Sequence, residues 1–298
     1  MTAESDFGGP GTATPKSVLG DLLDGGASVL MPGVWDALSA KLAAAAGFST
    51  VFVSGYCVSG SLLGLPDLGY LTQTEMAETA RRVCVAVPEL NVVVDADTGY
   101  GNALSAARTV ELWEHAGAAG LFLEDQVWPK RCGHMAGKQV VERAEWLAKL
   151  RAACATRTSL HVTARTDARA CLGLDEAIER AKMARDTGVD ALFVEAPETV
   201  SEMERVAAAL PGITLVANMV EFGRTPLLTP AELAELGFRL IVSPLSLLFS
   251  AVLAMQTTLG QLAIDGTMRG HLDQMVDFDG FGHVVGLADR LDAEQRYH

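Results

Sequence analysis

The feature that most constrains the fold of this chain is a regular alternation of short apolar runs with amphipathic segments. Eight apolar runs occur, at 28–33, 50–55, 91–97, 120–125, 160–167, 191–197, 214–219 and 239–244. Runs that are apolar almost throughout predict strands buried on both faces, as in a parallel sheet covered by helices. Eight such strand and helix units predict an α/β fold, a closed (β/α)8 TIM-type barrel.

The segments between the predicted strands have the 3.6-residue spacing of apolar residues that is typical of helices. Gly117 and Gly188 follow two of these segments as C-terminal caps. The length of 298 residues suits one barrel, which typically needs about 250. We expect a polar, mobile arm at 1–14, a single barrel domain at 15–298, and within it an extra C-terminal helical segment from about 262 to 298. Because that segment has nothing left in the barrel to complete, we expect it to pack on a neighbouring subunit.

Charge and cysteine usage exclude several function classes. The net charge is −14 and no run of Lys or Arg occurs, so nucleic acid is not an expected partner. The N-terminus lacks the basic start and apolar stretch of a signal peptide. The five cysteines form no CxxC pair, and Cys84 and Cys154 lie in predicted helices as core residues would. We expect a cytoplasmic protein with free thiols.

One stretch is long enough to cross a membrane. No charged residue occurs between Leu240 and Ile264. Pro244, two serines and the sequence QTTLGQ interrupt its hydrophobicity. We therefore expect a buried strand followed by a buried helix, and no membrane partner.

Polar side chains follow nearly every predicted strand at its C-terminal end. In a barrel of this kind, these ends and the loops after them form the catalytic face. Side chains from most of the strands are thus predicted to meet in one mouth. They are Ser54, Asp95 with Asp97, Glu124 with Asp125, Arg165 with Asp167, Glu195, Asn218 with Glu221, and Ser243.

The carboxylates of this set predict a divalent metal site. Asp95 and Asp97 share a face at strand spacing, and Glu124 ends the next strand. Converging carboxylates repel one another unless a cation neutralises them. Because all three are hard oxygen donors with no cluster of His or Cys beside them, Mg²⁺ is favoured, with Mn²⁺ as the alternative ion.

Arg165 is the natural clamp for an anionic substrate, since its planar guanidinium matches a carboxylate. The alternative is a structural ion pair with Asp167 or Glu195. The glycine-rich stretch SGYCVSGSLLGLPDLG predicts a loop whose backbone amides approach an anion, or else a tight turn that carries Asp67.

Cys132 lies outside any apolar run, between the basic pair Lys130 and Arg131 and the pair Gly133 and His134. Nearby positive charge favours a reactive thiol, which serves as a nucleophile or as a proton donor. The alternative is a Cys-x-His zinc pair, which would need further ligands.

Six sequence stretches together resemble one family. They are KRCGH, DADTGYG, LEDQ, ARTDAR, SGYCVSGSLLGLPDLG and ANMVEFGRTP. In this order they are similar to the isocitrate lyase and phosphoenolpyruvate mutase superfamily, and the resemblance runs from about residue 28 to the C-terminus. It implies an α/β barrel with bound Mg²⁺, a homotetramer, and a small anionic carboxylate as substrate. The cysteine of KRCGH points to the lyase branch, and within it to enzymes that cleave oxaloacetate and 2-alkylmalates.

The resemblance also implies roles for individual residues. Asp97 would bind Mg²⁺, Asp95 and Glu124 would bind its water ligands, and Asp67 and Lys130 would lie behind them. Cys132 would protonate the leaving carbanion as its loop closes over the site. The substrate would contact the backbone of Ser54 and Gly55, and the residues Tyr56, Gly133, His134, Arg165, Glu195, Asn218 and Arg269.

One departure from the family bears on the substrate. Methylisocitrate lyases carry an arginine shortly after PLS on the last strand, where this chain has Leu247, Leu248 and Phe249. Tyr56, which replaces a glycine of those lyases, narrows the pocket further. Both differences favour a smaller dicarboxylate, or one with an alkyl substituent. A 2-methylisocitrate lyase and a phosphonomutase that forms a carbon–phosphorus bond remain the alternatives.

Overall fold

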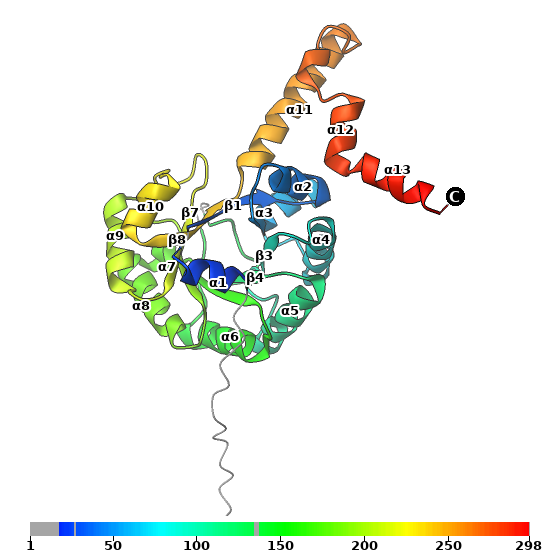
Figure 1. Cartoon of the computed structure of the whole chain (residues 1–298). Helices are drawn as coiled ribbons and strands as arrows, with labels where there is room; N and C mark the ends of the chain where they lie inside the picture. Colours follow the sequence, from blue (N-terminus) through cyan, green and yellow to red (C-terminus); the bar gives the residue numbers. More distant parts are fainter. Residues whose placement is uncertain (1–17, 27, 134–136, 298) are drawn as a thin grey trace, which may run out of the picture.

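The eight apolar runs form a closed barrel of parallel strands in which each strand pairs with the next and β8 pairs with β1. The computed structural model describes residues 18–26, 28–133 and 137–297. The predicted (β/α)8 fold is therefore confirmed (Figure 1), whereas the expected arm at 1–14 lies outside the described residues. The strands are β1 (Val29–Val34), β2 (Thr50–Val53), β3 (Asn91–Asp95), β4 (Gly120–Glu124), β5 (His161–Thr166), β6 (Ala191–Val194), β7 (Thr214–Asn218) and β8 (Phe238–Ser243).

Helices cover the outside of the barrel (Figure 1). Trp113 and Trp146, on neighbouring helices, are fully buried in the core between this layer and the strands. The helices of the barrel are α1 (Val18–Asp24), α2 (Ala37–Ala45), α3 (Gly55–Val58), the π-helix η1 (Ser59–Leu63), α4 (Gln73–Ala86), α5 (Ala103–Ala116), α6 (Arg143–Thr156), α7 (Ala168–Leu172), α8 (Leu174–Arg185), α9 (Val200–Ala209) and α10 (Pro230–Leu236).

The interior of the barrel is filled in layers. Side chains alternate between the two faces of a strand, so residues two apart point the same way. Phe52, Phe122, Phe193 and Val242 come from the four even-numbered strands and belong to one buried cluster. Layers supplied by alternate strands are the usual filling of such barrels. The next inward position of each strand, two residues on, therefore points into the mouth.

The short helix α1, which the sequence pattern did not predict, packs against the interior cluster. Leu19 is fully buried and Leu23 nearly so, both within the same cluster as Val29 and Ala191 at the starts of their strands. Leu19 also lies beside Gly120, the first residue of β4. This helix closes the N-terminal end of the barrel.

The helix after β8 differs from the expectation. β8 is buried as predicted, but α11 (Ser246–Asp265) has no buried residue within this chain. It projects away from the barrel (Figure 1), and Leu253, Leu259 and Ile264 are more than half exposed. The prediction of a buried helix is therefore wrong for the single chain. α11 follows β8, where the eighth helix of the layer would lie, but it projects away from the barrel, so its apolar side chains stay uncovered in the single chain.

Beyond α11 follow η2 (Leu272–Gln274), α12 (Phe278–Val285) and α13 (Leu287–Gln295), so the expected C-terminal helices are present. α12 returns to the barrel, where the Lys41 amine on α2 donates to the Val285 carbonyl at 3.3 Å. Among the described residues, α11 alone has the length and composition to cross a membrane. Length and apolarity of one helix are weak grounds for a membrane span.

The closing role of α1 gives a stability prediction. Leu19→Ala removes a fully buried side chain and leaves a cavity, so we expect a loss of about 2–5 kcal/mol in the free energy of unfolding. Leu22→Ala, on the exposed side of the same helix, is the matched control and should cost less than about 0.5 kcal/mol. Urea denaturation measures both, and equal effects of the two substitutions would show that α1 does not seal the barrel.

Candidate active site

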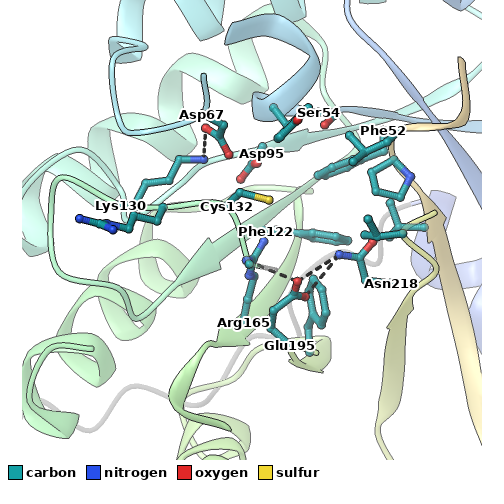
Figure 2. A pocket seen from close by; sticks show the side chains of 18 residues that line it. Phe52, Ser54, Asp67, Asp95, Phe122, Lys130, Cys132, Arg165, Glu195 and Asn218 are labelled. Carbon is teal, nitrogen blue, oxygen red and sulfur yellow. Dashed lines mark hydrogen bonds and ion pairs between the residues drawn. The ribbon is translucent and has the colours of Figure 1, made fainter. Parts of the chain in front are cut away.

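A cavity lies at the C-terminal ends of the strands, above the phenylalanine layer. Ten of the fifteen predicted site residues line it (Figure 2), whereas Asp97 and Glu124 lie beside it and do not line it. It is lined by Phe52, Ser54, Tyr56, Asp67, Asp95, Phe122, Lys130, Arg131, Cys132, Gly133, Arg165, Phe193, Glu195, Asn218, Val220, Val242, Pro244 and Leu245.

The two carboxylates after β3 are held by an unusual backbone. Asp97 adopts a left-handed conformation with φ of 44°, which is uncommon for a residue other than glycine. Its amide donates to Asp95 Oδ1 at 3.1 Å. Asp95 Oδ2 lies so near Gly55 that a Cβ there would approach it to 2.9 Å. A glycine at position 55 therefore lets the chain after β2 approach this carboxylate closely.

Lys130 joins two of the carboxylates. Its amine lies 2.7 Å from Asp67 Oδ1 and 2.8 Å from Asp97 Oδ1, and all three side chains are almost completely buried. Burial alone would lower the pKa of Lys130, but the carboxylates of Asp97 and Asp67 outweigh it and raise that pKa well above its usual value. Lys130 therefore stays charged.

The buried environment disfavours the charged form of the Asp97 carboxyl group. Burial raises its pKa to about 7, with the neighbouring Asp95 and Asp67 carboxylates adding to the rise and Lys130 opposing it. The rise is mainly the cost of burying this carboxylate, which the single ammonium group of Lys130 does not offset.

Arg165, at the end of β5, is shared among three carboxylates. Its Nε lies 3.0 Å from Asp167 and 3.3 Å from Glu124, and its Nη2 lies 3.8 Å from Glu195. Its guanidinium also stacks 5.2 Å from the centroid of the Phe193 ring. The ion pairs expected as the alternative role of Arg165 are thus present, and the same side chain lines the cavity where a substrate anion could reach it.

The donor set fits a hard divalent cation. Glu124 is buried, and its Oε1 atom has no hydrogen-bond partner among the described residues. Burial raises the pKa of Glu124 well above its usual value, with Asp167 adding to the rise and Arg165 opposing it. Within the part of the chain that the structure describes, no three Asp, Glu, His or Cys side chains converge to hold an ion alone. Such an arrangement suits Mg²⁺, which keeps several waters and takes few carboxylates directly.

The thiol of Cys132 points into the cavity from the segment after β4 (Figure 2). This segment is held by Gln126, whose side chain donates to the Arg131 carbonyl at 2.8 Å and accepts from the Arg131 amide at 3.0 Å. Gly133 packs so closely that a Cβ there would lie 2.1 Å from Glu195 Oε1 and 2.5 Å from Arg165 Nη2. A side chain at position 133 would therefore displace Glu195 and Arg165.

A second thiol lies close to the cavity without lining it. Cys57 is fully buried and donates to the Pro244 carbonyl at 3.1 Å. Burial raises its pKa to about 12. Cys84 and Cys154, expected as core residues, have pKa values raised by burial to about 11. All five cysteines are free thiols, as expected.

Part of the cavity lining is apolar. Val220 and Leu245 form a buried cluster with Cys57, and Tyr56 packs against it. Phe249, on α11, meets Tyr56 edge to face with ring centroids 6.2 Å apart. Phe249 belongs to the stretch where methylisocitrate lyases carry an arginine, so this difference from the family places an aromatic pair beside the cavity.

Glu195 and Asn218 form the remaining polar edge. The Asn218 amide donates to Glu195 Oε1 at 3.2 Å, and the Asn218 Oδ1 atom is buried without a hydrogen-bond partner in the described part of the chain. An unused acceptor beside the cavity is available to a substrate hydroxyl group. Glu221 and Ser243, also predicted at strand ends, instead bond to each other at 3.2 Å and do not line the cavity.

Two predictions differ from the structure, and two others are not tested by it. The Ser54 amide already donates to the Val34 carbonyl at 3.2 Å, so it is used within the fold. Residues 55–63 form α3 and η1 in place of the expected loop. Arg269 is exposed beyond α11 and does not line the cavity of its own chain, so its substrate contact stays a prediction. His134 lies outside the described residues.

The aromatic floor of the cavity was missed from sequence. Phe52, Phe122 and Phe193 stack in sequence around the barrel, with ring centroids 4.9 Å and 5.6 Å apart. Their positions could have been predicted from the sequence. Each phenylalanine stands two residues before a predicted polar residue, Ser54, Glu124 or Glu195, and therefore points to the same face of its strand.

Comparison with known proteins gives strong matches over nearly the whole chain. The family model described as phosphoenolpyruvate phosphomutase matches residues 19–263. Petal death protein of Dianthus caryophyllus is 46% identical over 95% of this chain and 89% of its own length. Chloroplastic carboxyvinyl-carboxyphosphonate phosphorylmutase of Arabidopsis thaliana is 47% identical over 90% and 80%. The crystal structure of 2,3-dimethylmalate lyase superposes with a TM-score of 0.90 at 36% identity, covering 94% of both chains.

The bridging role of Lys130 gives a prediction for the metal-free protein. Lys130→Met leaves the buried carboxylates of Asp67 and Asp97 without their ammonium partner, so we expect a loss of about 3–5 kcal/mol in the free energy of unfolding in EDTA. The loss should be smaller at pH 5 than at pH 8, because protonated carboxyl groups no longer repel.

Lys182→Met is the control, since its amine pairs with Glu179 at the exposed surface and should contribute less than about 1 kcal/mol. Urea denaturation at both pH values gives the comparison. Equal losses for Lys130→Met and Lys182→Met would contradict the buried bridge.

Proposed function

This chain belongs to the phosphoenolpyruvate mutase and isocitrate lyase superfamily, and we propose that it is a lyase dependent on a divalent metal ion. It cleaves the C2–C3 bond of a small dicarboxylate that carries a hydroxyl or keto group at C2. The observation that carries the proposal is the thiol of Cys132, which faces a cavity ringed by carboxylates and Arg165.

A proton donor is what this bond cleavage requires. When the C2–C3 bond breaks, its electron pair stays on the departing carbon, and the resulting enolate must be protonated. The Cys132 thiol points into the cavity that Asp95 and Asp67 also line (Figure 2). In the proposed reaction the C2 hydroxyl group gives its proton to a carboxylate at the cavity, and the resulting oxyanion becomes the new keto group as the C2–C3 bond breaks. Cys132 gives its proton to the departing carbon, and the proton taken from the hydroxyl group then restores the thiol. The products are an α-keto acid, or oxalate when the substrate is a hydrated 2-keto acid, and a protonated acid.

The residues around the cavity supply binding and orientation. Arg165 offers its guanidinium to a carboxylate, and the backbone at Gly55 approaches the same side of the cavity as Asp95. Asn218 Oδ1 offers an unused acceptor, and Glu195 lies next to it. The segment that carries Cys132 covers the cavity and limits the access of water to the carbanion.

We propose Asp97, Asp95 and Glu124 as the residues that hold the metal ion, Mg²⁺ or Mn²⁺, directly or through water. The unpartnered Glu124 oxygen and the raised pKa of Asp97 support this assignment. When bound, the ion stabilises negative charge on the substrate oxygens. Asp67 and Lys130 keep Asp97 in place.

The apolar wall favours an alkyl-substituted substrate. Tyr56, Val220 and Leu245 line the cavity and offer no charge to a third carboxylate. A tricarboxylate such as methylisocitrate would bury an unpaired charge there, which is costly. The similarity to 2,3-dimethylmalate lyase is in line with a 2-alkylmalate, and oxaloacetate is the smaller alternative.

A panel assay with purified protein tests the reaction. We expect turnover of 2-alkylmalates or oxaloacetate with Mg²⁺ and none in EDTA, with the keto acid or oxalate detected by chromatography. Cys132→Ser should lower kcat by about 100-fold or more, because the alcohol is a far weaker acid, while oxalate still binds.

Two results would contradict this assignment. Full activity of Cys132→Ser would remove the proton-donor role. Activity confined to a carboxyphosphonate, with a new carbon–phosphorus bond in phosphorus NMR, would instead establish the phosphonomutase function, which the similarity to the Arabidopsis phosphorylmutase favours. Cys154→Ser is the matched control, since this thiol lies on α6 outside the cavity.

We also propose that the protein is a cytoplasmic homo-oligomer, a tetramer by family resemblance, in which α11 packs on a second copy. Its apolar side chains include Leu253, Leu259 and Ile264, which are uncovered in the single chain. Leu253→Glu with Leu259→Glu should therefore shift the mass measured by light scattering toward the monomer. Gln256→Glu on the same helix is the control, and an unchanged mass for the double variant would contradict the packing.

A further inference from the structure

We propose that Lys138 is a positioning residue: its amine ties the Gly133 carbonyl to the Asp167 carboxylate and so holds the Cys132 thiol toward the cavity. This inference rests on the proposed function, in which Cys132 is the proton donor. Lys138 does not line the cavity, so it acts through its neighbours.

The contacts of Lys138 are short and buried. Its Nζ lies 2.6 Å from Asp167 Oδ1 and also donates to the Gly133 carbonyl. The side chains of Lys138 and Asp167 are almost completely inaccessible to solvent. An ammonium group in such a place binds strongly only because both acceptors are fixed, so its loss would leave a buried carbonyl and a buried carboxylate short of a donor.

Asp167 is a rigid anchor for this contact. Its amide donates to Asp125 Oδ1 at 2.8 Å, and Arg165 donates to its two oxygens at 3.0 and 3.2 Å. Burial would raise the pKa of Asp167, but Arg165 and Lys138 outweigh it and lower that pKa well below its usual value. The Asp167 carboxylate thus holds Arg165, the proposed substrate-binding residue. Through Lys138 it also holds the segment that carries Cys132, the proposed proton donor.

The Gly133 peptide has little freedom on its other side. A Cβ at this position would overlap Glu195 and Arg165, so the backbone lies directly against both side chains. Lys138 holds this peptide from the opposite direction through its carbonyl. Since Cys132 is bonded to Gly133, a shift of the peptide moves the sulfur, and a misplacement of about 1 Å can lower a rate by about 100-fold.

The test combines a labelling measurement with kinetics on the full-length protein. Lys138→Met should raise the rate at which iodoacetamide alkylates Cys132 at least fivefold, as followed by peptide mass spectrometry, because the thiol is no longer held in the cavity. On the substrate found in the panel assay, kcat should fall at least tenfold while the Kd for oxalate stays within threefold. Lys138→Arg, which keeps a charged donor, should restore most of both properties.

The matched control is Arg157→Met. Arg157 is another buried cation that joins a carbonyl, that of Gly188 at 2.7 Å, to a carboxylate, that of Asp190, but at the N-terminal end of the barrel. It should lower the melting temperature without changing the alkylation of Cys132. Lys138→Gln is a second variant with a smaller change in size, for use where Lys138→Met does not fold.

The outcomes separate the two proposals. An unchanged alkylation rate in folded Lys138→Met or Lys138→Gln overturns the positioning role, as does an equal change in Arg157→Met. Failure of the wild-type protein on every panel substrate overturns the proposed function instead, and the labelling experiment still decides whether Lys138 holds Cys132.

Discussion

The constraint on which this structure depends is the two-residue alternation of side chains in a closed parallel barrel. Each strand that places a phenylalanine or valine in the interior layer must aim its next inward residue at the mouth. Phe122 and Glu124 show this step on β4, and Phe193 and Glu195 repeat it on β6. The same geometry therefore builds the apolar floor and the polar rim, and a slip of one residue in any strand would exchange them.

Several buried carboxylates repel one another at the mouth of the barrel, and the nearby cationic side chains offset this repulsion only in part. Lys130 bridges Asp67 and Asp97, and Arg165 is divided among its three carboxylate neighbours. The pKa values of Asp97 and Glu124 remain raised, mainly by burial. A site left short of positive charge in this way favours a divalent cation and disfavours additional anions elsewhere in the cavity. Tyr56 and the apolar residues next to it are consistent with this charge balance, because they provide no partner for a further anion.

Much of the architecture was predictable, because strand burial and strand-end polarity are local in sequence. All eight strands lie within a few residues of their predicted positions, and most of the predicted polar residues face one cavity. What failed depends on distant neighbours. The short helix α1 has too few residues for a periodic pattern. The exposure of α11 follows from its projection away from the barrel, a direction that the periodicity of the helix does not encode. The contacts of Lys138 join segments separated by 29 positions, which no local pattern encodes.

Because α1 closes the N-terminal end of the barrel, it limits the routes by which solvent and products can reach or leave the site. With Leu19 closing one end and the phenylalanine layer beneath the cavity, solvent reaches the site from the other end alone. Both products of a cleaved substrate would then leave through the opening of the cavity beside Cys132. In the proposed reaction, a fragment bound on the phenylalanine layer would leave only after the fragment nearer the opening, so one end that is closed implies an order of product release.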